Sequence, residues 1–544
     1  MSPDDTALFQ SASVTRRRPS LLKDLAKLAR VTREFPRFLR TPITVGDAAE
    51  TIKQRLATRA VRFIALARRT IYANSRSPYL PLLRAAGCEL GDLEALVAAD
   101  GLEGALTKLA QAGVYLTFDE FKGRKQIIRG SLRMICNEDD FDNPGIVPHI
   151  EAWSGGTRSP GTSVKLSLSY FLDLAINTAI TLEMQGMSEY DHAVWLQGFT
   201  PGFIYAKLGR PVLAWFYPVG PLSLKHKAVS RYLVLLSRLA GRPLPPPRLL
   251  DIRDPGGLAN WLADRRKEGR AVCLTTYASS AVRICAAARE KGISLDGTSF
   301  ITLGEPFTEA KRRTVEAVGA RALVRYAFTE AGIIGYGCRS PREPDDVHFF
   351  RDSYGLIQRQ RAVGDPGLTV DAFLFTSLLP SAPKILVNVE SGDYGIFEQR
   401  SCGCELDALG LSTHIAQIRS FEKLSSEGMT FVQTDLLRLL EEVLPARFGG
   451  MSTDYQVVEE EAEQGILRLL LIVSPAIGPV DEDLIRTTFL DELGRDATFD
   501  RFGATIWRRA GTVEIRRQWP VATRAGKILP FHLLHATAAH DKTP

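Results

Sequence analysis

A loop rich in small residues is the first candidate for binding a charged ligand. Ser154, Gly155, Gly156 and Thr157 open a segment that runs to Thr162. Glycines leave backbone N–H groups open to phosphate oxygens, and hydroxyl groups add further donors. The segment lacks the Gly-Lys-Ser/Thr of a Walker loop. Taken alone, it is better explained as an ordinary Gly/Ser turn.

Three further positions supply charges of the kind that a nucleotide needs. Thr329 and Glu330 follow a strand-like run, where a carboxylate can hold Mg²⁺ against phosphate oxygens, although a helix N-cap explains the pair equally well. Asp393 lies between glycine and tyrosine and could accept both ribose hydroxyls, or simply form an Asx turn. Lys527 could supply charge to a developing phosphorane, or be one more exposed lysine.

A second set contains the ligand types that zinc prefers. Cys338, His348, Cys402 and Cys404 would give three sulfurs and one nitrogen, a common structural zinc set. The two cysteines of Cys402-Gly403-Cys404 are close enough to share one ion. The alternative is a group of reduced, buried thiols, and spacing alone does not decide between them.

The order of these segments is more specific than any one of them. Together they resemble the adenylate-forming superfamily of acyl-CoA synthetases and adenylation domains, and within it the phenylacetate-CoA ligase-like branch. The resemblance covers about residues 79–532. It includes an adenine segment (Gly304, Glu305, Pro306), an aromatic-Thr-Glu element (Tyr326, Phe328, Thr329, Glu330), the Asp at 393, a hinge beginning at Arg419, and a Gly-Lys pair ending at Lys527.

Three departures from the family pattern are visible. Ala327 replaces a glycine, and Thr162 stands where the phosphate loop usually ends in a lysine. Phe421, followed by Glu422, stands where the hinge usually has an aspartate. The altered hinge bears on the movement of the C-terminal unit more than on the chemistry.

The resemblance implies an α/β fold, with a large N-terminal adenylate-forming domain of mixed sheets and helices and a small α+β C-terminal lid. It implies an ATP-dependent acid–thiol ligase that forms an acyl adenylate, releases pyrophosphate and then makes a thioester, most simply an aryl or hydrophobic acyl-CoA. Lys527, Glu330 and Thr329 would be catalytic, and Glu330 would hold Mg²⁺. The phosphate loop, adenine segment, Tyr326, Phe328, Asp393 and Arg419 would bind nucleotide.

The same resemblance leaves several alternatives open. The acceptor thiol is that of coenzyme A or of a carrier protein, and an amine acceptor is a third option. A homodimer is compatible with the family pattern, and some members carry a structural zinc site of the Cys…His…Cys-x-Cys kind. A non-catalytic nucleotide-binding scaffold is the competing hypothesis, against which the retention of Glu330, Asp393 and Lys527 argues.

Composition fits a globular protein. The 544 residues are 45% hydrophobic and 24% charged, with a net charge of +6, which gives no reason to expect nucleic-acid binding. Seven cysteines indicate a reducing compartment rather than a disulfide scaffold, and no signal peptide is recognisable, so we expect a cytoplasmic protein. Residues 166–184 are interrupted by polar residues and predict a buried helix, not a membrane span.

The chain pattern predicts three parts: a basic helical extension (1–75), a large domain (76–418) and a lid (419–544). Residues 1–72 hold fifteen Lys or Arg against six acids and have a helical apolar period after residue 20. We favour helices packed on the main body over a surface for anionic lipid or an acidic partner. Strand-like runs at 211–217, 271–275, 299–303 and 322–326 alternate with helices, whereas 467–473 and 481–493 predict a strand and a helix of the lid, and 522–532 a loop.

Overall fold

The computed structural model describes residues 21–153, 163–196, 198, 200–218, 224–252, 254–362, 369–420, 425–426, 429–430, 435–461, 467–493, 513–523 and 526–534. The predicted phosphate loop and the first twenty residues therefore lie outside the described residues.

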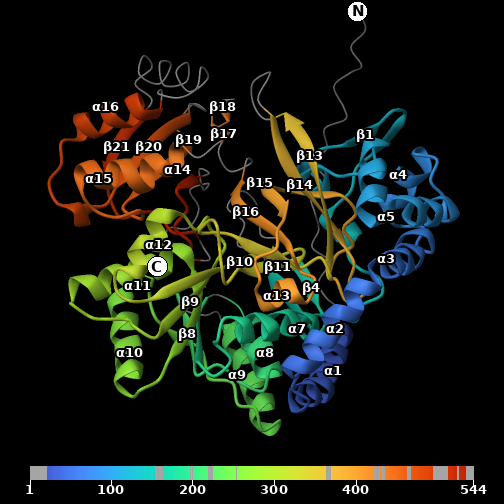
Figure 1. The fold of residues 1–544 in the computed structure, drawn as a ribbon, viewed down its shortest axis with the longest axis horizontal. Helices are drawn as coiled ribbons and strands as arrows, with labels where there is room; N and C mark the ends of the chain where they lie inside the picture. Colours follow the sequence, from blue (N-terminus) through green and yellow to red (C-terminus); the bar gives the residue numbers. More distant parts are fainter. Residues whose placement is uncertain are drawn as a thin grey trace, which may run out of the picture.

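A twelve-stranded sheet forms the centre of the large unit, in the order β13-β14-β15-β16-β12-β11-β10-β9-β8-β5-β6-β7 (Figure 1). Its strands are β5 (Asp191–Trp195), β6 (Ala214–Tyr217), β7 (Arg248–Leu249), β8 (Val272–Tyr277), β9 (Thr298–Leu303), β10 (Arg321–Phe328), β11 (Gly332–Gly337), β12 (Val347–Phe349), β13 (Tyr354–Ala362), β14 (Thr369–Ser377), β15 (Val389–Gln399) and β16 (Thr413–Ser420). The strands from β7 to β10 are parallel, and those from β10 to β13 are antiparallel. Four of these strands fall where the alternating pattern predicts them.

Helices cover the parallel half of the sheet. They are α7 (Leu168–Met184), α8 (Thr200–Lys207), α9 (Leu224–Leu239), α10 (Pro255–Lys267), α11 (Ala278–Glu290) and α12 (Glu309–Glu316), with α13 (Glu405–Ala408) after β15. Ser167 caps α7 by accepting from the Tyr170 N–H, and most of the helix is buried. The predicted buried helix at 166–184 is therefore confirmed, and within the described chain no helix is long and apolar enough to span a bilayer.

The N-terminal helices pack on this body. They are α1 (Leu21–Arg40), α2 (Val45–Ala57), α3 (Arg59–Ala67), the π-helical turn η1 (Arg68–Tyr72), α4 (Tyr79–Ala85), α5 (Leu90–Gln111) and α6 (Phe118–Phe121). Thr44 and Asp47 form a capping box at the start of α2. α1 contacts α8 and α9, and α2 contacts α7, so Phe35 and Ile52 are fully buried. The helical prediction for the basic segment is confirmed, and the described helices lie on the main body.

Short pieces complete the large unit. Two two-stranded sheets of this unit pair β1 (Ile127–Arg129) with β2 (Leu132–Met134) and β3 (Ile150–Trp153) with β4 (Ser163–Leu166), and a third, after β16 in the chain, pairs β17 (Ser425–Ser426) with β18 (Met429–Thr430). A 3-10 turn, η2 (Glu138–Phe141), follows β2.

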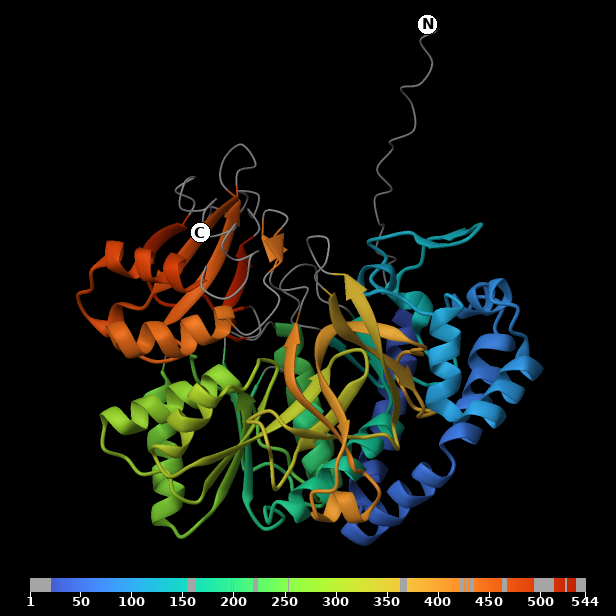
Figure 2. The ribbon, with the colours of Figure 1, turned by 45° about the horizontal axis from the view of Figure 1, so that its top comes forward.

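The C-terminal unit has its own four-stranded sheet, ordered β21-β20-β19-β22, and lies against α11 and α12 (Figure 2). Its elements are α14 (Asp435–Arg438), η3 (Leu439–Val443), α15 (Leu444–Phe448), β19 (Tyr455–Glu461), β20 (Leu467–Val473), η4 (Pro475–Ile477), α16 (Glu482–Leu493), β21 (Val513–Arg517) and β22 (Phe531–Leu534). The α/β fold with a large and a small unit is thus as predicted. The three-part division of the chain stays a prediction.

One expectation about the small unit needs correction. Residues 522–532 were expected to be a loop, but β22 begins directly after Pro530 and pairs in parallel with β19. Proline has no N–H to donate, yet its carbonyl accepts from the Val457 N–H at 2.8 Å and so aligns the strand. A proline directly before an edge strand costs no hydrogen bond of the ladder.

Candidate functional site

The carboxyl ends of three parallel strands form one edge of the large sheet. Tyr277 of β8 lies opposite Leu303 of β9, which in turn lies opposite Arg325 of β10. Gly304 and Tyr326 therefore come side by side just beyond these pairs. In open α/β sheets, ligands bind in the crevice outside such ends.

Lys527 reaches this edge from the small unit. Its Nζ lies 5.4 Å from the centroid of the Tyr277 ring. A Cβ placed on Gly304 would lie 2.8 Å from the same Nζ, so a side chain there would displace the lysine, and the φ of +77° also favours glycine. The loop of the small unit is held by Thr523, whose N–H donates to the Lys527 carbonyl at 2.8 Å. The structure thus brings together two predicted segments that lie far apart in the sequence.

Glu305 anchors the adenine segment. Its carboxylate accepts from the Ser279 N–H at 2.7 Å and from the Ser279 hydroxyl at 2.8 Å, at the start of α11. Burial raises the pKa of Glu305, while Lys311, Ser279 and Lys527 oppose the shift. The same hydroxyl of Ser279 accepts from the Ile528 N–H at 3.3 Å, so one serine joins the segment to the lysine loop.

A buried ion pair lies behind this segment and was missed by sequence reasoning. Lys311 of α12 donates to the Pro306 carbonyl and to Glu441 of η3, each at 2.7 Å. The side chains of Lys311 and Glu441 are 2% and 1% exposed. Thr308 also donates to Glu441. This group connects the large and small units directly beside Gly304-Glu305-Pro306, and no local motif marks it.

Tyr326 and Asp393, which are both predicted to bind nucleotide, are hydrogen-bonded to each other. The Tyr326 hydroxyl donates to Asp393 Oδ2 at 2.8 Å, although the residues come from β10 and β15. Burial, and next the charge of Asp393, raise the pKa of Tyr326, so the phenol remains a neutral donor. Phe328 packs near the Tyr326 ring at a centroid separation of 6.4 Å.

Arg419 has a partner other than the predicted one. It lies on β16, where it is opposite Tyr394, and donates to Asp345 at 2.9 Å. Asp345 also accepts from the N–H groups of Gln417 and Ile418. A ribose-binding role for Arg419 stays a prediction, and Phe421 and Glu422 of the hinge lie outside the described residues.

Glu330 is paired with a cation that sequence reasoning missed. Thr329 and Glu330 lie in the turn between β10 and β11, and Lys122, just after α6, donates to Glu330. Glu138 also pairs with Lys122 at 3.2 Å. The side chains of Lys122 and Glu330 are 6% and 11% exposed. An ammonium group therefore stands where the prediction places a magnesium ion.

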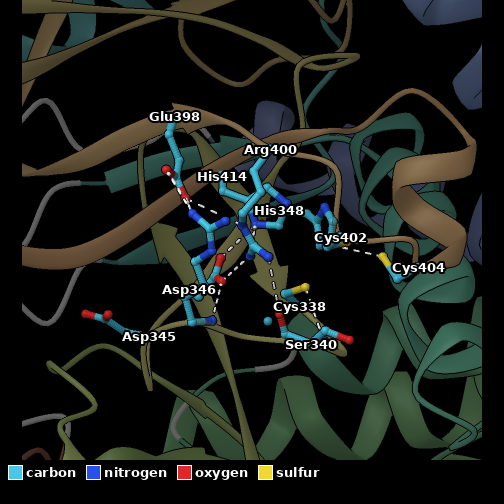
Figure 3. A network of polar contacts seen from close by, with 12 residues as sticks. Cys338, Ser340, Asp345, Asp346, His348, Glu398, Arg400, Cys402, Cys404 and His414 are labelled. Carbon is cyan, nitrogen blue, oxygen red and sulfur yellow. Dashed lines mark hydrogen bonds and ion pairs between the residues drawn. The ribbon is translucent and has the colours of Figure 1, made fainter.

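The three cysteines and the histidine of the second set come together from three segments (Figure 3). Cys338 follows β11, His348 is on β12, and Cys402 and Cys404 lie between β15 and α13. His348 Nε2 is 3.6 Å from Cys402 Sγ and 3.1 Å from Cys404 Sγ. The four predicted ligands are therefore neighbours in space.

His414 joins this cluster and was set aside by sequence reasoning. It lies opposite His348 in the pairing of β12 with β16, and the two rings are 4.2 Å apart. Cys338, His348, Cys402 and His414 each place one ligand atom within 4.8 Å of the others. Only the strand register reveals His414, because its spacing in the sequence resembles no metal motif.

The donor set fits a zinc ion. His348 Nδ1 is 2.7 Å from the Leu411 carbonyl, which can only accept, so its Nε2 presents a lone pair toward the thiols. His414 Nδ1 is 2.7 Å from Asp346, and its Nε2 is buried without a partner among the described residues. Metal-binding histidines are oriented by such bonds to carbonyls and carboxylates. Hydrogen bonds with Cys338 and, against burial, with His348 lower the pKa of Cys404, and the first of these bonds raises the pKa of Cys338, so Cys404 is the cysteine of this pair that favours a thiolate ligand.

No family model and no curated protein matches the sequence. Among solved structures, the chain is similar to a 2-hydroxyisobutyryl-CoA ligase in complex with 2-HIB-AMP and CoA (14% identity, 91% of each chain, TM-score 0.43). It is also similar to ATP-bound MatB from Rhodopseudomonas palustris (12% identity, 73% of this chain and 68% of that one, TM-score 0.41). A third similar structure is the O-succinylbenzoate coenzyme A synthetase MenE from Bacillus subtilis in complex with ATP and magnesium (13% identity, 82% of this chain and 84% of that one, TM-score 0.39).

Proposed function

We propose that this chain activates a carboxylic acid with ATP and passes the acyl group to a thiol. The observation that carries the proposal is the position of Lys527. A lysine of the small unit lies on Gly304, at the carboxyl edge of the parallel strands and beside the bonded pair of Tyr326 and Asp393. This combination supports binding of a nucleotide with its reacting phosphate near the lysine.

In the first half-reaction, a carboxylate oxygen attacks the α-phosphorus of ATP and the bond to pyrophosphate breaks. Lys527 would orient the carboxylate and offset charge on the α-phosphate. Asp393, held by Tyr326, would accept the ribose hydroxyls. Gly304, Glu305 and Pro306 would form the adenine wall. Ser154, Gly155, Gly156 and Thr157 would hold the leaving pyrophosphate.

Glu330 and Thr329 would hold Mg²⁺, which neutralises phosphate oxygens when bound. The carboxylate of Glu330 suits a hard cation, and Lys122 already binds it in this arrangement. Mg²⁺ would bind the Glu330 carboxylate either together with the ammonium group of Lys122 or in its place. Lys122 is thus a second cation beside the phosphates, in a chain whose phosphate loop lacks the usual lysine.

In the second half-reaction, a thiol attacks the acyl carbon and AMP leaves. The acceptor we propose is coenzyme A, with a carrier-protein thiol or an amine as alternatives, and the acid an aryl or hydrophobic one. The zinc ion would be structural, since Cys338, His348, Cys402, Cys404 and His414 offer more than the four ligands a closed site needs. It would hold β12 and β16 beside β15, which carries Asp393.

Acid-dependent release of pyrophosphate tests the proposal. Purified protein with ATP and Mg²⁺ is given aryl, fatty and amino acids in turn, with and without coenzyme A. We expect release with one class of acid, and thioester only when the acceptor is present. A folded protein that binds ATP but releases no pyrophosphate with any acid would instead support the scaffold hypothesis.

A further inference from the structure

A cavity of about 500 Å³ lies between the N-terminal helices and the large sheet, away from both sites above. Its lining residues come from α2, α3 and α5, from the segment before β13 and from the residues directly after α13. Figure 1 labels these elements. It shares no lining residue with the proposed nucleotide or zinc site. Three of the described lining residues are cations, namely Lys53, Arg59 and Arg351, and none is acidic.

The guanidinium of Arg59 is hydrogen-bonded to other residues of the chain. Its guanidinium binds both carboxylate oxygens of Glu103, and its Nε donates to the Arg351 carbonyl at 2.6 Å. Against burial, the hydrogen bonds and charge of Arg59, and then the charge of Arg351, hold the pKa of Glu103 below its usual value. The carboxylate of Glu103 is thus hydrogen-bonded to Arg59, and it offers Arg351 a nearby charge but no hydrogen bond.

Arg351 is the cation of this cavity whose guanidinium has no hydrogen-bonded partner among the described residues. Among the described residues, none forms a hydrogen bond or ion pair with its guanidinium, and Glu103 acts on it only through charge. Burial lowers the pKa of Arg351, and the neighbouring charge of Arg59 lowers it further. A half-buried guanidinium beside another cation is more stable when an anion also hydrogen-bonds it, and Glu103 supplies only its charge. Lys53, on the solvent side, adds a third positive charge.

The remaining wall is apolar. Leu56, Leu102 and Leu409 line the cavity between the charged groups. A guanidinium binds carboxylate or phosphate oxygens through two parallel hydrogen bonds. We propose that this cavity binds an organic oxyanion, a carboxylate or phosphate monoester on an apolar body, with Arg351 as its principal contact.

Titration calorimetry of the full chain with phenyl phosphate, and separately with 3-phenylpropionate, tests the proposal. We expect at least one probe to bind, and Arg351→Gln to weaken binding about tenfold or more. Lys53→Gln, at an exposed position that folding does not depend on, should weaken it about threefold. Arg313→Gln, at an exposed arginine on α12, should leave the affinity unchanged. Because the probes can also enter the proposed acid and nucleotide site, each titration is repeated in the Lys527→Ala background, where the loss caused by Arg351→Gln should persist.

The outcomes separate this site from the nucleotide site. Binding that falls with Arg351→Gln or Lys53→Gln in the Lys527→Ala background as well supports the cavity. Binding that falls only with Lys527→Ala, or no binding of either probe to the unaltered chain, overturns the proposal. Should Arg351→Gln fail to fold, Lys53→Gln and Arg351→Lys, which keeps the charge but loses the fork, decide the question.

Discussion

Replacing Lys311 by methionine should release the small unit from the large one. The ammonium group of Lys311 is buried and bonds Glu441 and the Pro306 carbonyl, each at 2.7 Å. Removing one partner of a buried ion pair costs about 3–5 kcal/mol, because the other charge stays buried and unpaired. Each 1.4 kcal/mol is a factor of ten. The ratio of docked to undocked small unit should therefore fall by roughly two to three and a half orders of magnitude.

Undocking removes Lys527 from Gly304, so the variant should lose adenylation before it loses its fold. We expect acid-dependent pyrophosphate release to fall at least tenfold in Lys311→Met, while circular dichroism shows both units folded. Arg312→Met is the matched control, since Arg312 is the next residue on α12 and forms exposed ion pairs with Glu309 and Glu316. Exposed ion pairs contribute little to stability, so the rate of pyrophosphate release by Arg312→Met should stay within about twofold of that of the unaltered protein.

A double variant sharpens the test. Lys311→Met with Glu441→Met replaces the ion pair by apolar contact, which is often neutral or stabilising. It should recover most of the lost rate. Unchanged pyrophosphate release in Lys311→Met, or a double variant as impaired as the single one, would refute the argument that this pair holds the small unit in place.

Three further outcomes are expected. Elemental analysis of the purified protein should find about one zinc per chain, and His348→Ala should lose it and melt at a lower temperature; equal zinc content in the two would contradict the site. Burial lowers the pKa of His192 to about 4, so as the pH falls the unfolded chain binds a proton at this histidine before the folded chain does. About 3 kcal/mol of the free energy of unfolding should therefore be lost between pH 6.5 and pH 4. His192→Phe keeps a ring stacked on Tyr205, and its unfolding in denaturant should show less of this loss. Lys122→Gln should lower the Mg²⁺ concentration needed for half-maximal pyrophosphate release, because the ion no longer competes with an ammonium group for Glu330; a higher requirement would contradict this.

The repeating pattern of the chain made most of the fold predictable. Apolar runs at 271–275 and 299–303 are buried strands, and the apolar period after residue 20 is helical, because both follow local periodicity. The small unit was also visible as a strand and a helix. The start of β22 was not, because its position depends on pairing with β19 rather than on its own residues.

The residues of the candidate sites also fall into two groups, those that short motifs predict and those that only distant contacts reveal. Gly304, Tyr326, Asp393 and Lys527 were found from short motifs, and the structure brings them to one edge. Their partners were not found. His414, like Lys122 and Lys311, acts through residues more than fifty positions away in the sequence, and a lone lysine or histidine carries no local signal of a distant carboxylate or metal site.

The most direct test of the central claim compares the unaltered chain with Lys527→Ala in acid-dependent pyrophosphate release. Lys267→Ala, an exposed lysine on α10 whose side chain is 76% exposed, is the control. The account predicts that Lys527→Ala loses roughly a hundredfold or more in rate, with ATP still bound and Lys267→Ala unaffected. Equal rates in Lys527→Ala and the unaltered chain would contradict the assignment of this lysine and of the edge it contacts.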